Sequence, residues 1–445
     1  MINISIITVF PEIFTPFLKL SLIGRAVEKG LVSFNLVRFS DFCAPLERID
    51  EPTAGPGAGM ILKPEVVEKA INFCQERWGN GHKIFFSPQG KTLNQNVLKE
   101  IAQKVLAQGP DVSTHATENS AHIILVCPRY EGMDARVEAS YADSIISIGD
   151  YVLMGGDLPA QVFLEGFLRL VPGIIGKMES VEEDSFSGPF LDHPEYGLPT
   201  TWHNQTIPEI VQSGNHAAIK QWRRTEAAKK TMLKRFDWFV SQRPNTQALT
   251  LALQAIPPHY VALMHTQVLL KDGSIGTTSV TSIDLHDTAR SCRMYNIKNF
   301  FIVTPLIDQQ RIIKMFLDFW NSDTGRKYNE SRYSAVRRVI TTHQLDDIIQ
   351  QITALEGKKP LVIATSAREH QHSTKIDYYS QGAVWQHDRP VLFLFGTGHG
   401  LDPALTSQCD FLLDPVTSMT DYNHLSVRSA IAIVLDRWLG LKGKR

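Results

Sequence analysis

Short runs of apolar residues alternate with longer amphipathic segments along most of the chain. The runs at residues 83–86 and 299–303 are rich in Ile, Phe and Val, which is typical of buried strands. Each is followed by a segment whose apolar positions repeat with helical spacing, at residues 94–108 and 308–320 respectively. This alternation predicts an α/β fold built on mostly parallel sheets.

The pattern also contains an internal repeat. The apolar run at residues 123–127 is followed by PRYEGMD, and the run at 391–395 is followed by GTGHGLD, about 268 positions later. Both copies then continue into a second apolar strand and an apolar helix. Two modules of one architecture explain the repeat most economically, although convergent α/β patterning could leave a similar trace.

Changes in composition divide the chain further. Residues 168–190 are rich in glycine and acidic residues and indicate a linker. A polar helical stretch follows, and Pro257 and Pro258 mark the main boundary. We therefore expect an α/β domain at residues 1–165, a flexible linker with a helical domain at 166–250, and a second α/β domain at 257–445.

Composition and charge limit which classes of protein and ligand the chain can represent. A net charge of −1 gives no global attraction to nucleic acid, although a local basic patch would be sufficient for RNA. The five cysteines form no CxxC pair, and the chain starts without a signal peptide, so we expect a cytoplasmic protein without membrane segments. His370 and His372 lack further ligands nearby, and we expect no metal site.

Three glycine-containing loops carry the candidate chemistry of the first half. They lie at residues 87–90, 129–132 and 147–160, each where a predicted strand ends. Ligands of open α/β sheets bind at the carboxyl ends of strands. Glycine allows backbone to approach a ligand closely. The loops therefore predict a ligand site, with an ordinary glycine-rich turn as the alternative from composition alone.

A basic helix is predicted at residues 220–235, with seven Lys or Arg against one Glu. Arg223, Lys230 and Lys234 fall on one face at helical spacing. The helix could contact RNA phosphates or be a solvated surface, and the pattern does not decide between them. The RNA-binding candidates are Lys220, Arg223, Arg224, Lys230 and Lys234.

Eight motifs along the first 240 residues resemble, in order and spacing, the bacterial tRNA (guanine-N1)-methyltransferase family. They are ITVFPEIF, GRAV, GAGM, SPQG, RYEGMDARV, SIGDYVLMGGDLPA, EEDSF and SGNHAAIKQWRR. The resemblance implies a trefoil-knotted (SPOUT-type) fold, S-adenosyl-L-methionine as cofactor and a homodimer whose site takes residues from both subunits. The implied substrate is tRNA with guanine at positions 36 and 37, methylated at position 37, with no DNA partner.

The resemblance also assigns roles to individual residues. Asp184 falls on the catalytic aspartate, which would take the N1 proton of guanine, and Arg169 falls on the arginine that would stabilise charge on O6. The implied cofactor-binding residues are Ser87, Pro88, Gln89, Gly90, Pro128, Tyr130, Glu131, Gly132, Ile148, Gly149, Asp150, Tyr151, Val152, Leu153, Gly155, Gly156 and Pro159.

Three departures from the family pattern affect the detailed contacts. Pro128 stands where the family often has glycine, and it lacks a backbone N–H. The loop at residues 52–60 is one residue longer than usual, and Asp157 stands where glutamate is frequent.

Residues 260–445 resemble the knotted RNA methyltransferases more distantly, closest to S-adenosylmethionine-dependent domains known as fusions to the guanine-N1 enzymes. We therefore expect two knotted modules with a small helical domain between them. The second-module candidates are Arg290, Gly396, Gly398, Gly400, Asn423, His424 and Ser426. The match implies no RNA target.

Alternatives for the second module remain open. Ser426 could simply cap the following helix. The module could be an inactive RNA- or cofactor-binding clamp. The GTGHG loop also suggests a dinucleotide-binding domain, although its spacing is not G-x-G-x-x-G.

Overall fold

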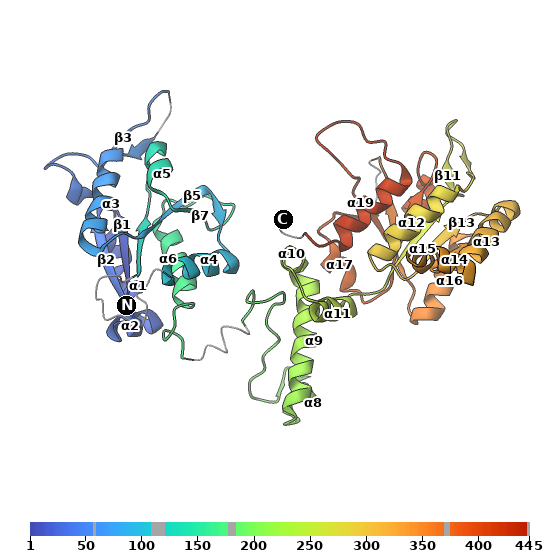
Figure 1. Ribbon diagram of the computed structural model, residues 1–445, viewed down its shortest axis with the longest axis horizontal. Coiled ribbons are helices and arrows are strands. Elements are labelled where there is room, and N and C mark those ends of the chain that lie inside the picture. The colour runs from blue at the N-terminus through green and yellow to red at the C-terminus, as the bar shows by residue number, and fades with distance from the viewer. Residues whose placement is uncertain (57–58, 108–120, 177–183, 369–373, 443–445) are drawn as a thin grey trace. The chain divides into compact units, whose positions relative to one another are not determined.

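Each half of the chain is built on a parallel sheet with helices on both faces (Figure 1). The computed structural model describes residues 1–56, 59–107, 121–176, 184–368 and 374–442. The chain separates into two compact units, Met1–Ser187 and Gly188–Arg445. The parallel α/β class expected from the pattern is confirmed. His370, His372 and most of the loop at 108–121 lie outside the described residues.

The first unit has a five-stranded sheet in the order β2-β1-β6-β5-β7, with all neighbours parallel. Its strands are β1 (Ile2–Thr8), β2 (Val32–Arg38), β5 (His82–Thr92), β6 (Ala121–Val126) and β7 (Ser144–Ser147). A hairpin of β3 (Asp50–Pro52) and β4 (Met60–Leu62) lies outside this sheet. The central strand β6 is buried along its whole length, which explains why its sequence is an unbroken apolar run.

Helices cover both faces of this sheet. One core includes residues of α2 (Ser21–Glu28), α4 (Gln95–Leu106) and α6 (Asp157–Leu168), and the other includes residues of α3 (Pro64–Trp78) and α5 (Ala135–Tyr141). The short helices are η1 (Pro11–Ile13), α1 (Thr15–Lys19) and η2 (Phe39–Phe42). Val171 and Ile174, from the predicted linker, are buried in the first of these cores.

The second unit has a seven-stranded parallel sheet in the order β14-β13-β10-β17-β15-β18-β16. The strands are β10 (His259–Met264), β13 (Phe300–Val303), β14 (Val339–Thr342), β15 (Leu361–Thr365), β16 (Lys375–Ile376), β17 (Val391–Gly396) and β18 (Phe411–Leu413). A small hairpin of β11 (Val268–Leu269) and β12 (Ile275–Gly276) follows β10.

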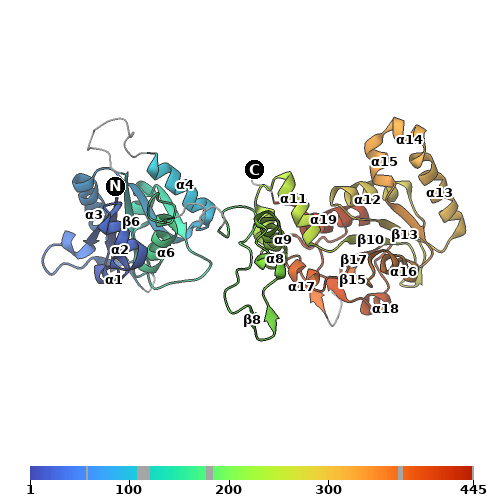
Figure 2. The same ribbon diagram turned by 90° about the horizontal axis from the view of Figure 1, so that it is seen from below.

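In Figure 2, α12 (Ser282–Met294), α15 (Glu330–Val336) and α19 (Val427–Leu439) lie on one face of the second sheet, and α16 (Leu345–Glu356) and α18 (Pro403–Ser407) lie on the other. The remaining helices around the sheet are α13 (Ile307–Asn321), α14 (Asp323–Tyr328) and α17 (Gln381–Trp385). Among the described residues, no helix is long and apolar enough to cross a bilayer.

Five strands of the second sheet repeat the order of the first, with β13-β10-β17-β15-β18 in place of β2-β1-β6-β5-β7. Local contacts repeat as well. The Asp143 carboxylate accepts a hydrogen bond from the Lys83 backbone N–H at 2.8 Å, and the Asp410 carboxylate accepts one from the Val362 N–H at 2.8 Å. Each aspartate precedes an apolar strand of the repeat and ties it to the neighbouring strand.

The loops after β6 and β17 share a backbone conformation. Gly132 and Gly400 have φ of +115° and +107°, and two residues later Asp134 and Asp402 each cap a helix with φ near −55° and ψ of 127°. The repeat read from the sequence therefore extends to strand order, strand-edge contacts and loop geometry.

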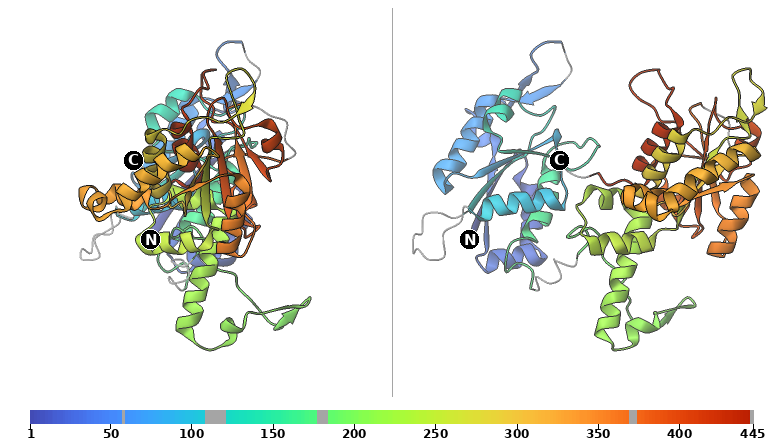
Figure 3. Two further views of the ribbon diagram at one scale, coloured as in Figure 1. Left: turned by 90° about the vertical axis from the view of Figure 1, so that its right-hand side faces the viewer. Right: turned by 45° about the vertical axis from the view of Figure 1, so that its right-hand side comes forward.

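A helical segment of α8 (Glu209–Gln212), α9 (His216–Lys234), α10 (Phe236–Ser241) and α11 (Thr246–Ala255) precedes the second sheet. In Figure 3, α9 extends away from the sheet towards α8 and the hairpin of β8 (Thr201–Trp202) and β9 (Gln205–Thr206). This segment shares a core with the second sheet rather than forming its own compact unit. The three-domain division at 165/166 and 250/257 stays a prediction, since compactness divides the chain only once, at 187/188.

The joint between the helical segment and the second sheet is densely packed. Met232, Phe239 and Val240 are nearly fully buried, and the Phe236 ring lies edge-on to Trp385 at 4.9 Å between centroids. The indole N–H groups of Trp385 and Trp438 both donate to His259 Nε2, at 3.0 and 3.2 Å. Burial lowers the pKa of His259 to about 4, so the imidazole stays neutral and can accept both hydrogen bonds.

The shared core predicts how the chain unfolds. Phe239→Ala should destabilise the second unit by about 3–5 kcal/mol, because a buried aromatic ring is replaced by a cavity. Calorimetry of the full chain should show the transition of the second unit, helical segment included, move to lower temperature. Leu168→Ala, a buried change in the first unit, should leave that transition in place. A separate unfolding transition for the helical segment would contradict the shared core.

Candidate functional site

A cavity of about 390 Å³ lies at the ends of β6 and β7, bounded by the loops that follow these strands and by residues 87–89. The sequence analysis expected a strand to end before residues 87–90, but these residues lie within β5, at the point where its pairing with β7 shifts register between Phe86 and Lys91. The cavity is lined by all of the predicted cofactor-binding residues except Gly90 and Asp150: Ser87, Pro88, Gln89, Pro128, Tyr130, Glu131, Gly132, Ile148, Gly149, Tyr151, Val152, Leu153, Gly155, Gly156 and Pro159. The fold thus brings together three segments that are far apart in the sequence, at residues 87–89, 128–132 and 148–159.

The chain after β7 passes very close to the end of β6. The Gly156 N–H donates to the Pro128 carbonyl at 2.8 Å, and Arg129 pairs with Gly155 in an antiparallel bridge. A Cβ on Gly156 would lie 2.5 Å from Pro128 Cδ and 2.9 Å from Cys127 Cα. Only glycine fits there without movement of the backbone. Pro128 needs no N–H in this arrangement, because it contributes its carbonyl.

A buried ion pair fixes the same crossing. Asp157 is 1% exposed and accepts hydrogen bonds from Thr8 Oγ1 at 2.5 Å and from Arg129 Nε at 2.8 Å. The Arg129 guanidinium also lies 4.9 Å from the centre of the Phe10 ring. A buried carboxylate without partners would cost several kcal/mol, so this network stabilises the joined ends of β1, β6 and the start of α6.

Tyr130 is held in a conformation that is rare for a residue with a side chain. Its φ is +61°, and Gly398, at the corresponding place in the second module, has a φ of +62°. Non-glycine residues in this region are uncommon, and they cluster at functional sites. The Tyr130 side chain is half exposed and lines the cavity.

The sequence analysis placed Arg129 and Ser147 in its candidate loops without a role, and it did not assign five further residues that line this cavity: Phe86, Met133, Ala135, Glu138 and Ile146. Most are apolar or small, and their types carry no chemical signal. Nearby, hydrogen bonds from Arg136 lower the pKa of Asp134, the cap of α5, to about 2. Burial raises the pKa of the Cys127 thiol, which therefore stays protonated and is unsuited to act as a nucleophile.

The predicted catalytic residues contact each other but do not line the cavity. Arg169, at the end of α6, forms an ion pair with Asp184, and both side chains are nearly half exposed. Neither residue is among those around the 390 Å³ cavity. The neighbouring Glu179, Glu182 and Glu183 lie outside the described residues.

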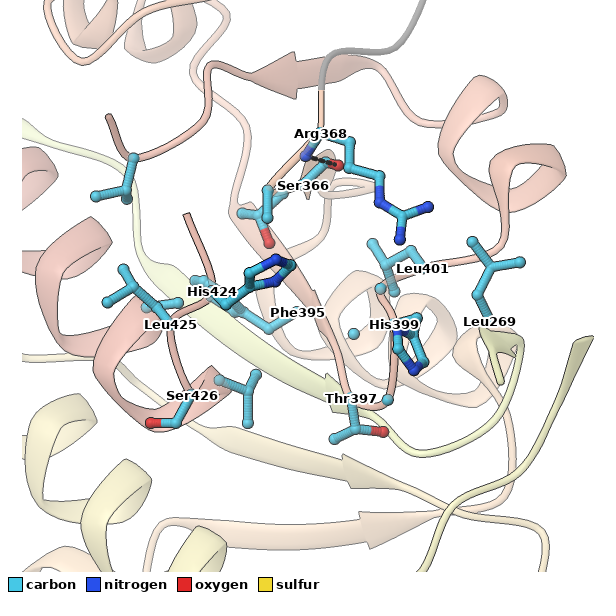
Figure 4. Close-up of a pocket in the computed structure, with 18 of the residues that line it drawn as sticks. Leu269, Ser366, Arg368, Phe395, Thr397, His399, Leu401, His424, Leu425 and Ser426 are labelled. Carbon is cyan, nitrogen blue, oxygen red and sulfur yellow. Dashed lines mark hydrogen bonds between the residues drawn. The ribbon is translucent and has the colours of Figure 1, made fainter. Parts of the chain in front are cut away.

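A second cavity, of about 640 Å³, lies at the corresponding ends of β15 and β17 in the second module. Six of the seven second-module candidates line it: Gly396, Gly398, Gly400, Asn423, His424 and Ser426. Figure 4 shows His399 from the loop after β17 and His424 from the segment before α19 around this space. The Ser426 hydroxyl also accepts a hydrogen bond from the Ser429 N–H at 3.3 Å, so it caps α19 as well.

Arg290 is the second-module candidate that the structure places elsewhere. It lies on an exposed part of α12 and borders a shallow depression of about 580 Å³, not the 640 Å³ cavity. The residue of α12 that does line the cavity is Asp284, six positions earlier. Helical rotation and rise between these two positions place Arg290 on another surface of the module.

Behind the second cavity lies a buried hydrogen-bonded chain. His265 Nδ1 lies 3.2 Å from Thr278 Oγ1, which is 2.6 Å from Thr397 Oγ1. Burial lowers the pKa of His265 to about 4, so the ring is neutral. Both threonines line the cavity, and the chain fixes their positions.

The five predicted RNA-binding residues all lie on α9, but they differ in their contacts. Lys230 forms an ion pair with Asp192 at 2.7 Å, and Arg223 lies 3.7 Å from Glu195. Lys220, Arg224 and Lys234 are exposed and form no ion pair with any described residue.

Both modules therefore present backbone loops around ligand-sized cavities at the ends of parallel strands, which is where α/β ligand-binding proteins hold their ligands. Residues 2–241 match the family model described as tRNA (Guanine-1)-methyltransferase TrmD, and residues 258–440 match that of a SAM-dependent RNA methyltransferase. The chain belongs to the tRNA (guanine-N1)-methyltransferase family, and its cofactor is S-adenosylmethionine.

Some relatives match almost the whole chain, and others match about half of it. A tRNA (guanine-N(1)-)-methyltransferase of Nitratidesulfovibrio vulgaris is 35% identical over 443 residues, covering 98% of this chain and 99% of its own. A tRNA (guanine-N(1)-)-methyltransferase of Dictyoglomus turgidum is 39% identical over 238 residues, which cover 53% of this chain and 89% of its own. The solved structure of a tRNA (m1G37) methyltransferase from Aquifex aeolicus is 27% identical in sequence and has a TM-score of 0.40. The match covers 50% of this chain and 87% of the Aquifex aeolicus chain.

The residues around the first cavity fit this cofactor. Its volume lies in the range of small-molecule sites, and its walls combine backbone of glycine-containing loops with the apolar side chains of Ile148, Val152 and Leu153. An adenine ring and a ribose need such a combination of backbone hydrogen bonds and an apolar slot.

The close approach at Gly156 gives a test of the first cavity. Gly156→Ala should raise the KM for S-adenosylmethionine in 1-methylguanosine formation by about tenfold or more, because the added methyl displaces the wall made by Pro128. Gly176→Ala, where a Cβ meets nothing within 4 Å, is the matched control. An unchanged KM in the Gly156 variant would rule out this crossing as part of the cofactor site.

Proposed function

We propose that the first module methylates N1 of the guanine at position 37 of tRNA whose position 36 is also guanine, with Asp184 as the base. The observation that carries this proposal is the Arg169–Asp184 ion pair, together with the cofactor-sized cavity. When bound, S-adenosylmethionine supplies an electrophilic methyl group on a sulfonium.

The ion pair matches the Watson–Crick edge of guanine. That edge presents N1–H as a donor beside O6 as an acceptor. A carboxylate can accept the N1 proton, and a guanidinium can donate to O6. Guanine can therefore take the place of each partner in the Arg169–Asp184 pair. Asp184 then holds the departing N1 proton, and Arg169 stabilises the charge that develops on O6.

The active unit in this proposal is a homodimer. Asp184 and Arg169 do not line the cavity of their own chain, so the pair of one subunit would complete the cavity of the other. Apolar side chains beside the cavity support a covering partner, because Val152 is 90% exposed and Met154 is 88% exposed. Exposed apolar surface of this kind marks interaction sites.

We also propose that each module is a trefoil knot. In the first module the chain leaves β7 at the sheet edge and returns to the centre, where Gly156 contacts Pro128 and Asp157 contacts Thr8 of β1. A return that passes through the loop between β6 and α5 would produce the knot. Five strands of the second sheet have the same order as the five strands of the first, which supports the same chain path in the second module.

The helix α9 is the proposed tRNA contact. Lys220 and Arg224 are exposed, unpaired among the described side chains and one helical turn apart, which suits contact with successive phosphates. A tRNA substrate places the enzyme in the cytoplasm in this proposal.

In this proposal the second module binds S-adenosylmethionine and acts on an RNA. Its 640 Å³ cavity and the shared loop geometry support binding of the same cofactor. An inactive clamp is the second candidate. It is favoured by the observation that Arg290 does not line the 640 Å³ cavity of its own chain.

Asp184→Asn should reduce kcat for 1-methylguanosine formation by about 100-fold or more, because the amide cannot accept the N1 proton. Mass spectrometry of nucleosides from unmodified tRNA measures the product, and calorimetry should show unchanged cofactor affinity. Asp41→Asn, at an exposed carboxylate of the same unit, is the control. Normal turnover of the Asp184 variant would refute its role as base.

Removing charge from α9 should weaken tRNA binding without affecting the chemistry. For Lys220→Gln with Arg224→Gln, the slope of log Kd against log salt should become shallower by about 1.5–2, and the KM for tRNA should rise at constant kcat. The control pair, Lys19→Gln with Lys29→Gln, removes the same amount of positive charge from exposed sites of the first unit. If both pairs give the same slope as wild type, α9 does not contact the phosphates.

A further inference from the structure

Five arginines gather on one face of the second module, outside its cofactor cavity. Arg290 and Arg293 lie on α12, Arg332 lies on α15, and Arg337 and Arg338 follow α15. Contacts between α12 and α15 place these elements side by side, as Figures 1 and 2 show. We call these five residues the arginine strip.

The strip has no carboxylate partners among the described residues. None of its five guanidinium groups forms an ion pair there. The two carboxylates of the same helix, Asp284 and Asp287, are instead paired with Arg428 of α19, at 3.5 and 3.2 Å. Arg428 thus offsets the negative charge of α12, of which Asp287 also borders the depression beside Arg290.

Within the strip, Arg293 donates to Ser334 Oγ, Arg338 donates to the Ile297 carbonyl and Arg332 lies over the Trp320 ring. These partners are uncharged, so they leave the positive charge of the strip in place.

The arginines are close enough to repel one another. Burial and the nearby Arg293 and Arg337 lower the pKa of Arg338. Burial and the charges of Arg332 and Arg290 lower the pKa of His286, a residue of α12 whose ring packs edge-on against Trp320. Unopposed like charges destabilise a surface unless an anion binds there. The strip is therefore built for a polyanion.

The surroundings of the strip suit RNA. Arg290 and Arg293 border the open depression of about 580 Å³ between α12, α15 and α19. Tyr328, 76% exposed at the end of α14, offers a ring on which a base could stack. A second copy of the chain is a poor occupant, because a two-fold interface would bring the strip against itself.

The strip also adjoins the cofactor cavity. Asp284 lines the cavity, and Arg290 lies six residues further along α12, which is about 9 Å along the helix axis. An RNA backbone bound along α12 would therefore pass beside the mouth of the cavity.

We propose that the arginine strip is the RNA docking surface of the second module, where it binds the phosphates of the strand whose nucleotide enters the 640 Å³ cavity. This inference rests on the proposed action of the second module on RNA. It gives Arg290 a docking role in place of the role in the cavity that the motif suggested.

The test compares two triple variants of the full chain. Arg290→Gln, Arg293→Gln and Arg337→Gln removes three exposed charges of the strip, and Arg311→Gln, Lys314→Gln and Lys375→Gln removes three exposed charges elsewhere on the same unit. Affinity for a fluorescein-labelled unmodified tRNA and a labelled single-stranded RNA is measured between about 50 and 200 mM salt. Thermal melts establish that both variants are folded.

For the strip variant we expect the slope of log Kd against log salt to become shallower by about two to three for at least one RNA, while the control keeps the wild-type slope. Ultraviolet cross-linking should place RNA on peptides covering residues 284–294 and 331–338 in the wild type. Formation of 1-methylguanosine should stay normal, and any second labelled nucleoside should be lost.

Other outcomes distinguish the proposed docking surface from the proposed methyl transfer by the second module. Equal slopes in both variants, with no cross-links to these peptides, would overturn the docking surface. Dissociation of the strip variant in sedimentation, with the slope unchanged, would assign the strip to a protein interface and also overturn it. A reduced slope without any second methylated nucleoside in the wild type would keep the docking surface and make the second module a clamp.

Discussion

The first module depends on one close backbone crossing, at which the chain after β7 meets the end of β6. Gly155 and Gly156 lie against Pro128 and Arg129 with no room for a Cβ, and the buried Asp157 carboxylate holds Arg129 and Thr8. The crossing brings the loop at 148–153 over the end of β6 and residues 87–89 of β5, which forms the cavity. It also starts α6, at whose far end Arg169 meets Asp184. The cavity and the Arg169–Asp184 ion pair are thus positioned by the same constraint.

The two modules meet similar backbone demands with different residues. Tyr130 and Gly398 adopt the same left-handed φ, yet only glycine does so without strain. Strain is retained in the first module, where the Tyr130 side chain contributes to the cavity wall. In the second module a Cβ on Gly398 would lie 2.8 Å from the Leu269 carbonyl oxygen, so glycine there allows a close approach of two backbone segments.

Local patterns predicted what depends on local sequence. Strands such as β6 and β17, helix α9 and the loop residues of both cavities follow from apolar runs, helical spacing and motif matches. Features that depend on long-range packing were missed. Nothing in the sequence around Arg129 signals its pairing with Asp157, which lies 28 residues away. Arg290 was grouped with the cavity residues as a second-module candidate because a motif names a helix but does not give the direction in which each residue faces, and the structure places it on another surface of its own chain.

The helical segment shows why family matches and physical units can differ. The match to the guanine-N1 methyltransferases ends at residue 241, and the second begins at 258. The boundary between the matches therefore falls inside one core, where Phe239 and Val240 pack with Trp385 and Trp438. A Cβ on Gly382 of α17 would lie 2.2 Å from the Leu233 carbonyl oxygen, so α9 and α17 can approach only through a glycine. The helix that we propose docks tRNA for the first module is consequently held by the second sheet. Its orientation depends on the second module even if that module transfers no methyl group.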